Sequence, residues 1–397
     1  MRNYFLKFIH SKQAGGFILL LCTLIALMIA NSEMAHYYFS IWEMKIGFIG
    51  NDYVFQKTLR HWVDDGLMSV FFLLVGLEIK REFISGELSS AQKAILPGFA
   101  AIGGMLVPAL LFAFYNQGTA TADGWGIPMA TDIAFSLAVL SLIKGVPNSL
   151  RIFLVALAVA DDIGAIVVIA IFYSHTINLI YLSGAMLVLA ILMYMNKKKV
   201  YKVSWYLIFG IILWLLILQT GIHTTIAGVI LAFTIPFNME RENSPLHKLE
   251  ASLHTPVNFF ILPLFALANT GIIIQSGNFL SGLQSNESLG IILGLVLGKP
   301  IGIIGAVLVM SIFKIAKIPE GTNLWQFLGI GFICGIGYTM SIFITGLAYV
   351  NPEIVDSSKI AVLVASSLAA IIGFLIVKLT THKKKPLDDL IAVIADE

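Results

Sequence analysis

The chain has 397 residues, a formal net charge of +2, 58% hydrophobic residues and only 12% charged residues. Soluble domains carry roughly 25% charged residues, so this composition excludes an ordinary soluble enzyme. The small net charge gives no basis for nucleic-acid binding, and two cysteines, Cys22 and Cys334, form neither a disulfide framework nor a metal cluster. The composition therefore predicts a membrane protein whose function lies at its few intramembrane charges.

Apolar runs along the chain predict membrane-spanning helices, each about 20 residues long. We expect an all-α polytopic membrane protein, one integral membrane domain over 1–397 with about twelve transmembrane helices. The predicted spans are about 12–30, 60–80, 95–115, 124–143, 150–173, 179–196, 203–218, 221–237, 254–275, 289–312, 327–349 and 357–381.

Lysine and arginine positions predict the orientation. All but five of the 25 fall on the side that holds the N-terminus; Lys45, Lys57, Arg60 and Lys359 lie opposite, and Lys299 lies inside a span. This asymmetry predicts that both termini are cytoplasmic. No small-x-small cleavage site follows the first apolar run, so we expect a retained helix rather than a signal peptide.

The longest outer loop, about 31–59, includes the segment 44–58. Its residues Gly50-Asn51-Asp52 are typical of a hairpin turn, although an irregular loop fits them equally well.

Two spans are interrupted in a way that plain helices are not. The first, 124–135, contains Pro128 and Asp132, and the second has four glycines within 329–337. Each is the middle span of a three-span unit, about 95–173 and 289–381. This pairing predicts inverted-topology repeats with two discontinuous helices that cross at mid-membrane. The alternative is that the glycines only permit close helix packing.

The adjacent acids Asp161 and Asp162 are the strongest local signal for function. On a helix they lie about 100° apart, so both can border one cavity. Like charges this close raise the proton affinity of one of them, which suits groups that load and release protons. Lys299 lies near the middle of another apolar run; it either snorkels to the surface or pairs with an acid until a cation arrives.

Asp132 and Thr131 belong to the first interruption. Broken helices place partly positive N-terminal ends and partly negative C-terminal ends inside the membrane, and we expect Asp132 to offset the former and Lys299 the latter. Hydroxyl, carboxylate and freed carbonyl oxygens suit a small hard cation.

The remaining charged groups are less specific. Asp64 and Asp65 begin the second span, and Glu78, Lys80, Arg81 and Glu82 end it, where a solvated helix end explains the last four equally well. His223 is either a hydrogen-bonded structural residue or a proton sensor.

At these residues the sequence closely resembles the NhaA family of sodium/proton antiporters. The resemblance is carried by Phe71–Glu78, Pro128–Phe135, Ala158–Gly164, Gly298-Lys299-Pro300 and Gly335–Ser341. The family is itself a known example of inverted repeats with discontinuous helices, so the paired interruptions are not independent support.

The resemblance implies twelve helices, exchange of Na+ or Li+ for protons, and a bacterial inner membrane. It implies that Na+ binds at Asp161 and Asp162 with Thr131, that Lys299 pairs with Asp161, and that Asp132 compensates charge. No cofactor is implied. Membrane lipid is the surrounding partner, and 44–58 resembles the family's dimer-forming hairpin.

The resemblance also implies pH regulation. The residues that match the family's pH-responsive positions are Glu78, Arg81, Glu82, Glu250, His254 and His223. Ala251 and Ser252 replace residues found there in some members, which puts the pH threshold in doubt. We expect structural roles for Asp65, Gly335 and Gly337.

Three other kinds of protein are alternatives. A sodium-coupled symporter can share the architecture but does not need the Asp161–Asp162 pair, and a sodium channel does not need a buried lysine. An intramembrane aspartic protease has two membrane acids on separate helices, whereas here they are adjacent and Tyr338 follows Gly337. The sequence therefore favours an electrogenic antiporter over an enzyme.

Overall fold

The computed structural model describes residues 14–49, 54–174, 177–238, 244–274, 282–316, 318–319 and 321–381. The basic segment before residue 14 and the predicted turn Gly50-Asn51-Asp52 lie outside the described residues. The chain folds as two compact units. The first unit is Met1–Phe17, Glu82–Ala165 and Ile274–Glu397, and the second unit is Ile18–Arg81 and Ile166–Ile273.

The first unit holds both interrupted spans. Its elements are α6 (Ala91–Asn116), a 3-10 helix (Ala122–Met129), α7 (Ile133–Ser141), most of α8 (Asn148–Phe172), α15 (Asn286–Leu293), a π-helical turn (Gly294–Gly298), α16 (Lys299–Ile312), α17 (Leu324–Cys334), α18 (Tyr338–Ala348) and α19 (Pro352–Thr381). The segment 289–381 and all of 95–173 up to Ala165 therefore lie in one unit.

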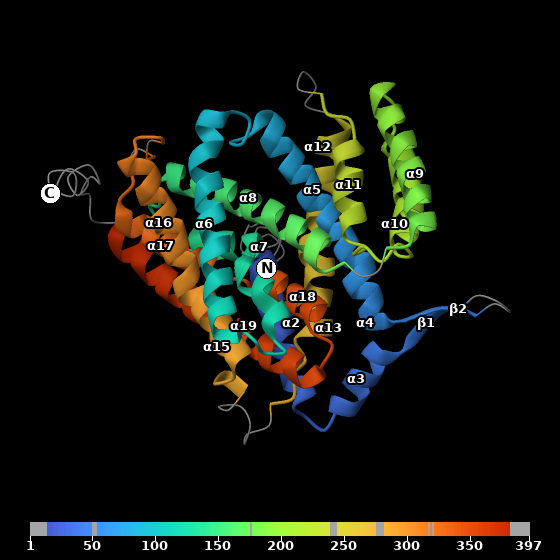
Figure 1. The fold of residues 1–397 in the computed structure, drawn as a ribbon, viewed down its shortest axis with the longest axis horizontal. Coiled ribbons are helices and arrows are strands. Elements are labelled where there is room, and N and C mark those ends of the chain that lie inside the picture. The colour runs from blue at the N-terminus through green and yellow to red at the C-terminus, as the bar shows by residue number, and fades with distance from the viewer. Residues whose placement is uncertain are drawn as a thin grey trace, which may run out of the picture. The chain divides into compact units, whose positions relative to one another are not determined.

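Helices α6 and α16 run side by side in the first unit (Figure 1). Gly103 of α6 faces Gly302 of α16, and a Cβ atom on Gly302 would lie 2.1 Å from the carbonyl oxygen of Gly103. Small residues that let two backbones touch are typical of helix packing in membranes. This contact fixes the start of α16, which carries Lys299.

The second unit contains the other helices and a short sheet. Its elements are most of α2 (Ala14–Ala30), α3 (Ala35–Glu43), β1 (Lys45–Ile49), β2 (Val54–Thr58), α4 (Leu59–His61), a π-helical turn (Trp62–Leu67), α5 (Met68–Ser85, up to Arg81), α9 (Leu179–Lys197), α10 (Val203–Ile217), α11 (Ile226–Thr234), α12 (Pro245–Pro256), a π-helical turn (Val257–Ile261) and α13 (Leu262–Asn269). Its core includes Leu77, Leu192 and Leu213, each at most 1% exposed.

Strands β1 and β2 form an antiparallel pair, with Lys45 opposite Thr58 and Ile49 opposite Val54. The pair extends away from the helices α3 and α4 that flank it (Figure 1). The sequence fitted both a hairpin and an irregular loop in this segment. The described residues form two paired strands, one before and one after the undescribed tip.

The helices have the length and surface of membrane spans. In the described ranges, seven helical segments are long and apolar enough to cross a membrane, or up to nine if each of two bent pairs is one span. Apolar side chains such as Phe114 (76%), Leu179 (74%) and Ile180 (79%) are exposed, as lipid-facing residues are. A helical membrane protein is therefore confirmed.

The count of twelve spans stays a prediction. It is reached only if α5, α10 and α11 also cross the membrane. Helix α5 carries four charged residues, Glu78, Lys80, Arg81 and Glu82, while α10 and α11 have 15 and 9 residues. Their charge and length place them outside the usual range for a span of about 20 apolar residues.

Candidate ion-binding site

Asp161 and Asp162 lie side by side on α8 and are buried, with 1% and 4% of their surface exposed. The stretch Asn148–Phe172 forms a continuous helix because aliphatic residues dominate it and it contains no proline. One charged side chain at the centre of a membrane helix costs about 2.5–3.5 kcal/mol on insertion scales, so these acids require partners or protons.

Lys299 supplies such a partner. It is the first residue of α16, directly after the π-helical turn Gly294–Gly298, and none of its surface is exposed. Its Nζ atom lies 2.7 Å from Oδ2 of Asp161. In the part of the chain described, the other carboxylate oxygen of Asp161, Oδ1, is buried without a hydrogen-bond partner. The pair thus leaves one buried acceptor for a proton or a cation.

Thr131 connects this ion pair to the two interruptions. Lys299 Nζ donates a hydrogen bond to the Thr131 hydroxyl at 2.9 Å, and that hydroxyl donates to the carbonyl oxygen of Cys334 at 2.8 Å. Cys334 is the last residue of α17, so its carbonyl belongs to the partly negative end of that helix. Lys299 therefore reaches a broken helix end through Thr131 rather than directly.

Asp132 lies where two helices begin. It is the N-cap of α7 and its Oδ1 accepts from the backbone N–H of Phe135 at 2.9 Å. Its Oδ2 accepts from the Thr339 hydroxyl at 2.6 Å and from the Thr339 N–H at 3.2 Å, near the start of α18. Both helix N-termini are partly positive and stabilise the negative carboxylate.

The two interruptions contact each other directly. The backbone N–H of Asp132 donates to the carbonyl of Ile336 at 2.7 Å, and the Ser136 hydroxyl donates to the carbonyl of Ile333 at 3.0 Å. Helices α17 and α18 are bent by 45° at their break. Backbone groups freed by each break are thus satisfied by the other, as buried backbone requires in a membrane.

Gly335 and Gly337 leave room for this arrangement. A Cβ atom on Gly335 would lie 2.3 Å from the carbonyl oxygen of Leu295, and one on Gly337 would lie 2.2 Å from the Ser341 hydroxyl. Leu295 is in the π-helical turn before Lys299. Gly335 therefore lets the break in 329–348 approach the backbone that positions Lys299, and Gly337 leaves room for the Ser341 side chain.

The structure divides the expected cation-binding residues into two groups. Asp161, Thr131 and Lys299 are joined by hydrogen bonds, with Asp162 next to Asp161 on the helix. Asp132 directs its carboxylate to the N-terminal ends of α7 and α18, and its contribution to cation binding stays a prediction. Sequence reasoning missed Thr339 as its partner; the signal was a hydroxyl residue directly after Gly337-Tyr338 in the glycine-rich break.

The ligand atoms at this site decide which ions suit it. Within the ranges described, no three His, Cys, Asp or Glu side chains converge on a point that could hold a metal ion. Two adjacent carboxylates and one hydroxyl offer oxygen ligands, which are the kind that hard cations prefer.

The expected pH-responsive residues lie elsewhere, mostly in the second unit. Arg81 Nε lies 3.1 Å from Glu250 Oε1, and His254 Nε2 lies 3.5 Å from Glu78 Oε1. Glu82, which begins a segment of the first unit, accepts from the backbone N–H of Glu87 at 2.9 Å. Two of these expected residues, Arg81 and His254, are 36% and 57% exposed, so water screens their charges.

Asp65 lies between two histidines. Its Oδ2 is 2.7 Å from His61 Nε2, and its Oδ1 is 3.7 Å from His223 Nε2. The Nδ1 atom of His223 forms a hydrogen bond with the Thr225 hydroxyl at 2.8 Å. The sequence left His223 open between a structural residue and a sensor, and these contacts fit both.

The fold and the site together define a class. A helical membrane protein with buried ionisable groups at two broken helices has the layout of a secondary transporter.

Comparison with known proteins gives the family. The family described as Na+/H+ antiporter 1 matches residues 6–377. The chain is 48% identical over 385 residues to a Na+/H+ antiporter NhaA of Cytophaga hutchinsonii, covering 96% of each chain. It is 48% identical to Na+/H+ antiporter NhaA 1 of Flavobacterium johnsoniae, covering 96% and 98% of the two chains. It is 45% identical to a Haemophilus ducreyi NhaA, covering 95% and 97%. The protein belongs to the NhaA family of Na+/H+ antiporters.

Proposed function

We propose that this protein exchanges cytoplasmic Na+ or Li+ for external protons across a bacterial inner membrane. The observation that carries the proposal is the buried Lys299–Asp161 pair at 2.7 Å, with Asp162 beside it on α8. The names of the relatives support the choice of ions. Nothing about the site favours a hydrolytic reaction.

Competition for one site provides the coupling. While no cation is bound, a proton neutralises Asp162 and Lys299 holds the carboxylate of Asp161 in an ion pair. An arriving Na+ is attracted by both carboxylates and by the Thr131 hydroxyl oxygen, and it displaces the protons. The unpartnered Oδ1 of Asp161 supports this, because a buried acceptor without a donor is stabilised by a cation.

The acid pair and Lys299 together make the exchange electrogenic. When Na+ binds, Asp162 loses its proton and Lys299, displaced from Asp161, loses one as well, so two protons leave for one monovalent cation. We propose that the site opens alternately to each side of the membrane through the inverted repeats 95–173 and 289–381. The location of 95–165 and 289–381 in one unit, around the broken helices, supports this.

We propose that pH regulates exchange through the second set of charges. The pairs Arg81–Glu250 and His254–Glu78 join α5 to α12, so a change of protonation changes the contact between these two helices. Glu82 and His223 extend this set, and histidine titrates in the physiological range.

The proposed assembly is a homodimer through the 44–58 segment. The pair β1–β2 has two edges and extends from its neighbouring helices, so a second copy can pair with it.

The asymmetry of lysine and arginine positions supports cytoplasmic termini. We propose no cofactor.

Transport by vesicles containing the purified protein tests the proposal. With a proton gradient and a pH-sensitive dye inside, Na+ and Li+ should dissipate the gradient, whereas K+ and choline should not. Asp162→Asn should abolish the response. Asp123→Asn removes an exposed acid of the same unit and should leave it intact. Undiminished exchange in Asp162→Asn contradicts the proposed site.

A further inference from the structure

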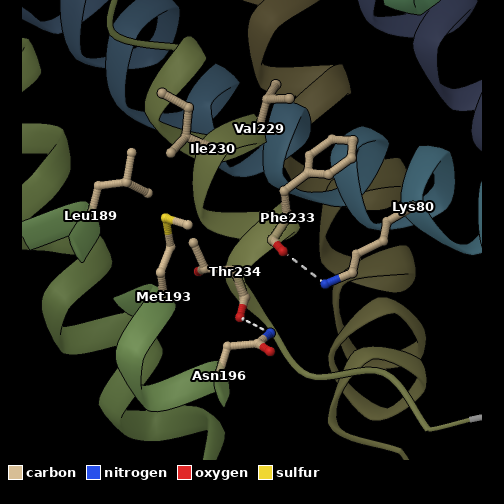
Figure 2. Close-up of a pocket in the computed structure, with 8 residues that line it drawn as sticks. All are labelled: Lys80, Leu189, Met193, Asn196, Val229, Ile230, Phe233 and Thr234. Atoms are coloured by element: carbon tan, nitrogen blue, oxygen red, sulfur yellow. Dashed lines mark hydrogen bonds between the residues drawn. The ribbon is translucent and has the colours of Figure 1, made fainter. Parts of the chain in front are cut away.

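The second unit contains a cavity of about 550 Å³ between α5, α9 and α11. Lys80 of α5 lies at one side, and Asn196 and Met193 of α9 lie at the other (Figure 2). The cavity belongs to none of the sites described above. Its lining combines one positive charge and one amide with a wall of aliphatic and aromatic side chains.

Both polar side chains have hydrogen-bond donors to spare. The Lys80 ammonium donates to the carbonyls of Phe233, at 2.8 Å, and Ile235, at the C-terminal end of α11. Asn196 Nδ2 donates to the carbonyl of Thr234 at 2.6 Å (Figure 2). An ammonium has three donors and an amide has two, so each group has one donor beyond those bonds.

Lys80 carries a charge that no carboxylate balances. Among the described residues its bonds are the two to backbone carbonyls, and no ion pair involves it. The neighbouring charged residues of α5, Glu78 and Arg81, pair with His254 and Glu250 of α12. A half-buried ammonium in an apolar cavity is therefore left to attract an anion.

The apolar wall is accessible to lipid. Met193 and Phe233 at its edge are 60% and 47% exposed, and in a membrane helix such residues contact acyl chains. Leu189, Val229 and Ile230 continue the wall along α9 and α11 (Figure 2). A small soluble anion has no apolar group that could contact this wall, whereas the acyl chain of a lipid can cover it.

We propose that this cavity binds one anionic phospholipid. Its phosphate accepts hydrogen bonds from Lys80 and Asn196, and one acyl chain lies along the wall formed by α9 and α11. Basic pockets between membrane helices hold anionic headgroups in this manner. The proposal does not depend on the antiport mechanism, because the cavity shares no residue with the Asp161 site.

Native mass spectrometry of the delipidated, full-length protein with added lipid tests this. Phosphatidylglycerol should bind more tightly than phosphatidylcholine. Lys80→Gln should weaken phosphatidylglycerol binding about fivefold, the effect of one basic residue at a membrane surface. It should leave phosphatidylcholine binding unchanged. Lys80→Arg keeps the positive charge and should still bind phosphatidylglycerol more tightly than phosphatidylcholine. This variant separates the loss of charge from the loss of the hydrogen bonds that Lys80 donates to the end of α11.

Two further experiments test whether the cavity binds a lipid with its acyl chain or only a headgroup. Met193→Trp fills the cavity and keeps the charge, so it should weaken phosphatidylglycerol binding as well. Glycerol phosphate, a headgroup without chains, should not compete. The matched control Lys248→Gln removes an exposed lysine of the same unit and should have no effect. Equal binding by Lys80→Gln and the parent protein, an equal loss in Lys248→Gln, or competition by glycerol phosphate overturns the proposal.

Discussion

Ion pairs in the two units differ in burial more than in distance. Lys299 and Asp161 of the first unit are 2.7 Å apart and 0% and 1% exposed. Arg81 and Glu250 of the second unit are 3.1 Å apart and 36% and 14% exposed, and His254–Glu78 is more open still. Removing two charges from water costs several kcal/mol per ion, so a buried pair persists only with excellent geometry.

This difference separates two kinds of role. A charge in the buried pair must always have a partner, so whatever displaces Lys299 has to bring a positive charge or a proton. The exposed pairs can lose a partner to water at little cost, typically about 0.2–1 kcal/mol. The first arrangement suits ion coupling, and the second suits gradual adjustment by pH.

Lys299→Ala gives the largest expected effect. It leaves Asp161 buried without its partner and should lower the free energy of unfolding by about 3–5 kcal/mol at neutral pH. Unfolding of the purified protein in detergent micelles, followed by circular dichroism, measures this. Lys299→Met combined with Asp161→Asn removes both charges and should recover most of the loss. An unchanged stability in Lys299→Ala contradicts the importance of burial.

Thr339→Val tests the charge at the helix ends. Thr339 donates to the buried Asp132 carboxylate, and a hydrogen bond to a charged group contributes about 1.5–3 kcal/mol. Thr345→Val on the same helix removes a buried hydroxyl that donates to the neutral carbonyl of Ser341, worth about 0.5–1.5 kcal/mol. If unfolding measurements give both variants the same loss, Asp132 does not carry the charge assigned to it.

Gly302→Ala tests the packing that positions Lys299. The added methyl group would lie 2.1 Å from the Gly103 carbonyl oxygen, so the backbones must separate. Overpacking of this kind costs about 1–3 kcal/mol. Gly305→Ala on the same helix meets nothing within 4 Å, and it should be neutral or stabilising by up to about 1 kcal/mol. Equal stability of both variants in the same unfolding assay would show that α6 and α16 are not tightly packed.

Breaking the Arg81–Glu250 pair should have the smallest effect. In a double-mutant cycle with Arg81→Gln and Glu250→Gln, we expect a coupling energy of at most about 1 kcal/mol, decreasing with salt. The pH at which exchange becomes half-maximal should shift in the single variants while the maximal rate changes little. A coupling as large as that of Lys299 and Asp161 removes the distinction between the two regions.

The charged residues and the breaks were predictable from the sequence, because a charge or proline is conspicuous in an apolar run. Asp161, Lys299 and the interruption at 130–132 are of this kind. Thr131 and Thr339 were harder, because a threonine in an apolar helix usually bonds to its own backbone. Thr131 links Lys299 to Cys334, and Asp132 accepts a hydrogen bond from Thr339. These contacts join residues that are 168 to 207 positions apart in the sequence.

The number of membrane spans is harder to predict for a related reason. Hydropathy identifies long apolar spans, but α11 has only nine residues. Most of them are buried because neighbouring helices pack around them. Whether such helices cross the membrane depends on packing that local sequence does not encode.

The most direct test of the central claim is Na+ binding measured by calorimetry in two buffers of different ionisation enthalpy. The comparison gives the number of protons released for each Na+ bound. Competition at Asp161 and Asp162 predicts release of more than one proton in the parent protein, and no Na+ binding in Asp162→Asn. Na+ binding without proton release would contradict the account.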